Sequence, residues 1–174
     1  LGDIPVLFRP FHENTGGWFW WGAATTDKET YRALFQYTQD YLASKGVHNF
    51  IYVYSPNGPL TSEEEYMDRY PGDDCVDIVA FDYYDDYNTY PAEYSGEFVD
   101  NLKKTCQVVK NIADAKGKVA AISETGVRVM KADGSDNEGI LVKGNPIAGH
   151  NWYKQVNQVA VDTGMPYFLL WANF

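Results

Sequence analysis

Apolar residues follow two patterns that alternate along the chain. Five short runs are almost continuously apolar and rich in β-branched and aromatic residues: 5–8, 50–54, 77–81, 119–122 and 167–171. Runs of this length without polar alternation predict strands that are covered on both faces. Between the runs, apolar residues recur every three or four positions, which predicts amphipathic helices.

The predicted helices also carry signals at their ends. Capping-box sequences occur at 26–29 and 62–65, and each would start a helix. The clearest apolar stripe runs from Phe98 through Leu102, Cys106 and Val109 to Ala113, and the last helix begins near Trp152. Glycines at positions 46, 117 and 164 follow the longer stripes, where they would end the helices.

The alternation of strands and helices implies right-handed βαβ units and a parallel sheet. A chain of 174 residues is expected to form one domain, and no long linker or internal repeat interrupts the series. Parallel sheets place their functional loops after the carboxyl ends of the strands. Those loops are therefore where site residues should be sought.

Composition narrows the classes of partner. The formal net charge of −10 disfavours duplex nucleic acid and anionic membrane surfaces, which are themselves polyanions. No apolar run approaches the roughly 20 residues of a membrane-spanning helix. Two cysteines, Cys75 and Cys106, exclude a disulfide framework; one bridge between them is open, and two buried free thiols are favoured.

Two glutamates follow predicted strands directly. Glu13 comes after the first strand and Glu124 after the fourth, so a parallel sheet would project both from the same rim. An ion pair or a loop cap could explain either residue alone. Together they supply the two carboxyl groups that cleave a glycosidic bond. We expect Glu13, flanked by indoles, to be the acid/base, and Glu124, bonded by a tyrosine such as Tyr83, to be the nucleophile.

Aromatic residues are concentrated in the loop that carries Glu13. The aromatic fraction is 16%, more than a core of this size requires, and Trp18-Phe19-Trp20-Trp21 has neither helical nor strand periodicity. A core would bury about two of these four rings, because consecutive side chains cannot all face one way. Exposed indoles are suited to the flat apolar face of a sugar ring. The loop therefore predicts a carbohydrate site, in an enzyme or in a binding module.

Other catalytic chemistries lack their motifs. His12 has no second histidine at zinc-helix spacing, so we expect it to orient Glu13 by hydrogen bonding rather than to bind metal. Ser123 is not in a nucleophile elbow, and no glycine-rich phosphate loop occurs. The acidic segments 82–86 and 133–138 lack EF-hand spacing and are read as solvated acidic faces. No metal or cofactor is therefore expected.

The sequence closely resembles glycoside hydrolase family 26. The resemblance rests on Arg9-Pro10-Phe11-His12-Glu13-Asn14, on 18–22, on Ser123-Glu124-Thr125-Gly126 and on Trp171. It implies a (β/α)8 TIM barrel, with Glu13 as acid/base after strand four and Glu124 as nucleophile at strand seven. It also implies that His12, Trp18 and Tyr83 line the cleavage site, with Tyr83 bonding the nucleophile, and that Trp171 lies under the sugar.

Matching Glu13 to strand four makes the five predicted strands the fourth to the eighth of that barrel. The first three βα units are then absent, and a barrel needs about 250 residues. The chain also starts at Leu1 without a leader, as expected of a processed or truncated product. We therefore expect residues 1–174 to be part of one catalytic domain, inactive alone, whose partner is the N-terminal part of the barrel.

The resemblance implies a retaining endo-β-1,4-mannanase that acts on β-mannan or a related plant polysaccharide. A polymeric substrate implies secretion to the medium, the periplasm or the cell surface. A β-1,3-xylanase or mixed-linkage glucanase with the same machinery, and a non-catalytic carbohydrate-binding domain, are the alternatives. A purely structural domain would leave the indole-rich loop unexplained.

Overall fold

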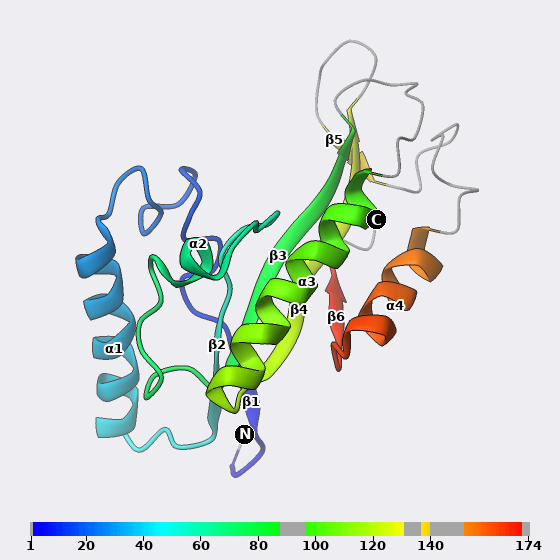
Figure 1. Ribbon diagram of the computed structural model, residues 1–174. Coiled ribbons are helices and arrows are strands. Elements are labelled where there is room, and N and C mark those ends of the chain that lie inside the picture. Colours follow the sequence, from blue (N-terminus) through cyan, green and yellow to red (C-terminus); the bar gives the residue numbers. More distant parts are fainter. Residues whose placement is uncertain (1, 88–96, 131–136, 140–151, 172–174) are drawn as a thin grey trace.

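The computed structural model describes residues 2–87, 97–130, 137–139 and 152–171. Strands and helices alternate as the sequence predicts (Figure 1). In chain order the elements are β1 (Val6–Phe8), α1 (Lys28–Ser44), β2 (Phe50–Tyr54), α2 (Glu63–Met67), β3 (Ile78–Tyr87), α3 (Glu97–Lys116), β4 (Val119–Met130), β5 (Asn137–Gly139), α4 (Trp152–Thr163) and β6 (Phe168–Leu170). All five predicted strands and all four predicted helices are present.

Five strands of the sheet are parallel. Strands β1, β2, β3, β4 and β6 pair in chain order, as successive βαβ units require. The short β5 joins β4 in the antiparallel direction. Strands β3 and β4 run several residues beyond the predicted apolar runs, and this extension carries the polar residues that the sequence pattern assigned to loops.

The helices bury their apolar stripes on one face of the sheet. Helix α3 lies across β3 and β4, and α4 lies beside it near β6 (Figure 1). Tyr31 and Phe35 of α1 and Leu102 of α3 are fully buried in this core. The cap of α1 is Asp27, one residue later than the predicted box, because its carboxylate accepts the Thr30 N–H at 2.9 Å.

The opposite face of the sheet has a second, smaller apolar cluster formed by Val53, Ile78, Ala80 and Ala121. Side chains two positions apart on a strand share a face. The residues that follow at that spacing are polar: Arg9 after Leu7, Ser55 after Val53, Asp82 after Ala80, and Ser123 after Ala121. Four neighbouring strands thus bring four polar side chains onto one face, with Asp82 and Ser123 lying within β3 and β4.

Cys75 and Cys106 are both free and buried, as predicted. In the part of the chain that the structure describes, no helix is long and apolar enough to cross a membrane.

Candidate active site

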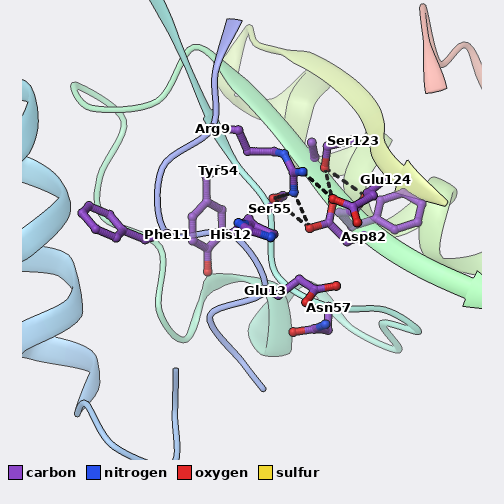
Figure 2. Close-up of polar contacts among 12 residues, drawn as sticks. Arg9, Phe11, His12, Glu13, Tyr54, Ser55, Asn57, Asp82, Ser123 and Glu124 are labelled. Atoms are coloured by element: carbon purple, nitrogen blue, oxygen red, sulfur yellow. Dashed lines mark hydrogen bonds and ion pairs between the residues drawn. The ribbon is translucent and has the colours of Figure 1, made fainter. Parts of the chain in front are cut away.

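A charged network joins the ends of β1, β3 and β4 (Figure 2). One Arg9 nitrogen, Nη1, donates to Asp82 Oδ2 at 2.6 Å, and the other, Nη2, donates to Glu124 Oε2 at 2.5 Å. Ser123 donates to the second Asp82 oxygen at 2.6 Å. One guanidinium therefore holds two carboxylates in a fixed arrangement, because its planar fork presents paired donors.

Glu124 has donors on both carboxylate oxygens. Arg9 donates to Oε2, and the Tyr84 hydroxyl donates to Oε1. Glu124 is only 7% exposed, so these two donors replace the water that a carboxylate needs. The two hydrogen bonds fix the orientation of this carboxyl group, as a nucleophile requires.

The tyrosine that bonds Glu124 is Tyr84, and the prediction that named Tyr83 is corrected. The register between β3 and β4 shifts after Phe81, so that Asp82 pairs with Glu124 and Tyr84 with Gly126. Paired residues share a face, and Tyr83 points to the other one. There its ring stacks on Phe98 of α3, with 5.0 Å between the ring centroids.

Glu13 lies in a tightly held turn after β1. Its backbone has a φ of 52°, and Phe11 has the same value. A left-handed conformation costs a residue other than glycine about 1–3 kcal/mol, so the surroundings must hold it in place. The Glu13 N–H donates to Ser55 O at 2.8 Å, and the Trp18 indole N–H donates to Glu13 Oε2 at 2.6 Å. A side chain at Gly16 would collide with that indole.

The two glutamates influence the pKa of the same two neighbouring side chains. The negative charges of Glu13 and Glu124 both contribute to raising the pKa of Asp82 and of Tyr84, although burial is the largest cause for each. For Asp82 the result is a pKa of about 7, even though Arg9 opposes the shift. Figure 2 shows Glu13 on the same side of the strand ends as Asp82 and Glu124. The predicted meeting of two carboxylates at one rim has this electrostatic support.

His12 precedes Glu13 in the chain, and its ring lies near those of Phe19 and Trp21. Burial, and then the Arg9 charge, lower its pKa, so the imidazole is neutral near pH 7. Its ring centroid is 5.0 Å from that of Phe19. A neutral imidazole here can accept or donate a hydrogen bond without adding charge to the site.

The Trp18–Trp21 segment divides as predicted, with two rings covered and two exposed. Phe19 and Trp21 stack with 4.4 Å between centroids, and the Trp21 N–H donates to His12 O at 2.8 Å, so this indole supports the loop. Trp18 and Trp20 are each 62% exposed. Across the sheet, Trp171 follows β6 and its side chain is 63% exposed. Its backbone N–H donates to Thr125 O at 2.9 Å.

The sequence pattern did not reveal the functions of Arg9, Ser55, Asp82 and Tyr84. The signal shared by the first three is a polar residue two positions after an apolar residue of the strand. Within the described residues no group of three metal-ligating side chains occurs, and the Asp82 oxygens are occupied by Arg9 and Ser123. Residues 133–136 of the second acidic segment lie outside the described residues.

A profile of the glycosyl hydrolase family 26 proteins matches residues 2–173. The chain belongs to glycoside hydrolase family 26. A mannan endo-1,4-beta-mannosidase of Bifidobacterium adolescentis is 33% identical over 98% of this chain, which spans 17% of that relative's length. The five parallel strands therefore form part of a (β/α)8 barrel, as the sequence predicts.

Solved structures of family 26 show the same fold. The catalytic domain of a Bacillus sp. JAMB-750 endo-beta-1,4-mannanase matches 98% of this chain with a TM-score of 0.82 and 40% identity, and the match covers 42% of that domain. A modular endo-beta-1,4-mannanase from Cellulomonas fimi matches with a TM-score of 0.81 and 36% identity, covering 98% of this chain and 36% of its own. The chain thus spans less than half of each.

Proposed function

We propose that this chain forms the nucleophile-bearing part of a retaining endo-β-1,4-mannanase, with Glu13 as acid/base and Glu124 as nucleophile. The observation that carries the proposal is the set of hydrogen bonds that holds the two glutamates: Arg9 and Tyr84 donate to Glu124, and the Trp18 indole donates to Glu13. The two glutamates come from different strands and are 111 positions apart (124 − 13). Two carboxyl groups brought together in this way are the machinery of glycoside hydrolysis.

The reaction proceeds by two displacements. The Glu124 carboxylate attacks the anomeric carbon while Glu13 gives its proton to the departing glycosidic oxygen, which leaves a glycosyl ester on Glu124. Glu13 then takes a proton from water as that water displaces Glu124, and the sugar is released with its original anomeric configuration. Retention requires carboxyl groups about 5–5.5 Å apart.

Exposed indoles support a carbohydrate substrate. Trp18, which donates to Glu13, and Trp171, whose backbone bonds Thr125 next to Glu124 in the chain, are both exposed, and an indole face complements the apolar face of a pyranose. The three relatives described above are named as mannan endo-1,4-beta-mannosidase or endo-beta-1,4-mannanase, which supports β-1,4-mannan. A glucan is the second candidate, because an Endoglucanase H of Acetivibrio thermocellus is 31% identical over 45% of this chain.

We further propose that three preceding βα units complete the barrel around this chain, and that the enzyme acts outside the cell or in the periplasm, where a polysaccharide is accessible. The term complete catalytic domain is used below for this chain together with those units. Residues 1–174 alone should be inactive, because β1 and β6 would both be open sheet edges. Mannan hydrolysis by the isolated chain would contradict this part of the proposal.

The proposal is tested with Glu13→Ala and Glu124→Ala in the complete catalytic domain. Loss of the acid should slow cleavage of manno-oligosaccharides far more than cleavage of a dinitrophenyl mannoside, whose leaving group needs no proton. Loss of the nucleophile should abolish both reactions. Equal losses with both substrates in Glu13→Ala, or activity retained with either substrate in Glu124→Ala, would refute the assigned roles. A reducing-end assay on mannan, β-1,3-xylan and mixed-linkage glucan identifies the polymer, and binding without cleavage would indicate a binding module.

A further inference from the structure

Arg69 is a buried cation whose contacts lead to the catalytic loop. It lies just after α2 and is 5% exposed. Its Nη2 donates to Thr26 O at 2.9 Å and to Trp21 O at 3.2 Å. A buried guanidinium is costly unless its protons are hydrogen-bonded. Here the Nη2 protons are given to the backbone of the segment that carries the exposed indoles, whereas the buried Nε has no hydrogen-bond partner among the described residues.

The same guanidinium also holds Tyr31. Its central carbon lies 4.8 Å from the centroid of the Tyr31 ring, within the range of a cation–π contact. Tyr31 is fully buried and its hydroxyl donates to Phe11 O at 3.1 Å. Phe11 is two residues before Glu13. Arg69 and Tyr31 together therefore hold both ends of the segment 11–26, and Glu13 lies between these ends.

We propose that Arg69 is a positioning residue for Glu13, acting through the backbone of segment 11–26; this inference rests on the proposed function. Glu13 and Phe11 both hold left-handed backbones, so the turn depends on its anchors. A general acid must lie within hydrogen-bond reach of the leaving oxygen, and a displacement of about 1 Å can cost a factor of about 100 in rate. Arg69 keeps Glu13 at that distance by holding the backbone of segment 11–26, without itself lying in the site.

The substitution Arg69→Lys distinguishes an effect of the positive charge of Arg69 from an effect of its shape. A lysine side chain keeps the positive charge but lacks the flat guanidinium, which lies over the Tyr31 ring while its Nη2 reaches the carbonyls of Trp21 and Thr26. Arg32 offers a matched control, because its Nη2 also donates to two backbone carbonyls, of Asp68 at 2.6 Å and of Met67 at 3.4 Å. Those carbonyls belong to α2 and the residue after it, not to segment 11–26.

The experiment measures kcat/KM of the complete catalytic domain for mannotetraose and for dinitrophenyl mannoside. Arg69→Lys should lower kcat/KM for mannotetraose about 10- to 100-fold and that for the aryl mannoside less than about threefold. Arg32→Lys should leave the ratio of the two values unchanged. Tyr31→Phe, which keeps the ring and removes the hydroxyl that donates to Phe11 O, should shift the ratio in the same direction by a smaller factor.

Equal losses of kcat/KM for both substrates in Arg69→Lys, or an unchanged ratio in Tyr31→Phe, would overturn the inference, since a general loss of structure lowers kcat/KM for both substrates alike.

Glu13→Ala is measured in parallel. If Glu13→Ala shows the substrate-dependent loss and Arg69→Lys does not, the inference fails and the proposed function stands. If Glu13→Ala also affects both substrates equally, the assignment of Glu13 fails and the inference fails with it. A substrate-dependent loss in both variants supports both.

Discussion

Replacing Asp82 with asparagine tests the electrostatics of the site. Asp82 is buried, and burial raises its pKa from 3.8 to about 7, with the Arg9 and Ser123 contacts opposing the shift. Between about pH 4 and pH 7, folded Asp82 therefore keeps a proton that the unfolded chain has released. Because the folded state binds more protons, raising the pH in this range favours unfolding.

The size of the effect follows from the pKa values. Each unit of difference is worth about 1.4 kcal/mol, and two units of pH, from 5 to 7, lie within the interval where only the folded state is protonated. The asparagine in the variant carries no charge and retains the shape needed to meet Arg9 and Ser123. The stability of Asp82→Asn relative to the unaltered protein should therefore grow by about 3 kcal/mol between pH 5 and pH 8.

The assay is urea unfolding of the complete catalytic domain at pH 5, 6, 7 and 8, followed by tryptophan fluorescence. Asp68→Asn is the control, because the Lys28 contact lowers the pKa of Asp68 and its titration ends below this range. A difference between Asp82→Asn and the unaltered protein that stays constant from pH 5 to pH 8, or that shrinks, would refute the reasoning.

Three further predictions concern single side chains. Tyr84→Phe removes a donor to Glu124 and should lower kcat about tenfold, whereas Tyr83→Phe on the other face should have a much smaller effect; the reverse order would contradict the register. Trp171→Ala should raise KM for mannotetraose about two- to tenfold with little change in Tm, because the indole is exposed; an unchanged KM would argue against stacking. Burial raises the pKa of Cys106 to about 12, so its thiol should react with Ellman's reagent only after unfolding, and rapid labelling of the native protein would contradict the buried placement.

The order of strands and helices could be predicted from the sequence because parallel strands are buried on both faces. Continuous apolar runs such as 50–54 then differ clearly from the amphipathic stripe at 98–113. The ends of β3 and β4 could not be predicted in this way. Residues 82–87 are acidic and aromatic, and they form a strand because β4 pairs with them along their whole length. Pairing of this kind depends on tertiary contacts that a local pattern does not contain.

The site was predictable where a residue's place in the chain fixes its place in the fold. Glu13 and Glu124 are candidates from the sequence because each follows an apolar run, although Glu124 itself lies within β4. The Arg9 contacts with Asp82 and Glu124 span 73 and 115 positions, so no local pattern reveals them. The choice between Tyr83 and Tyr84 depends on a register shift, and a shift of one residue moves a side chain to the other face.

Covalent trapping of the nucleophile tests the central claim most directly. A 2-deoxy-2-fluoro-mannosyl fluoride should form a stable ester on the enzyme, since the carboxylate displaces fluoride and the fluorine at carbon 2 slows hydrolysis of the ester. After digestion of the inactivated complete catalytic domain, mass spectrometry should find the sugar on Glu124. A label on another residue, or turnover of the reagent with inverted configuration and no ester, would contradict the assignment of Glu13 and Glu124 as a retaining pair.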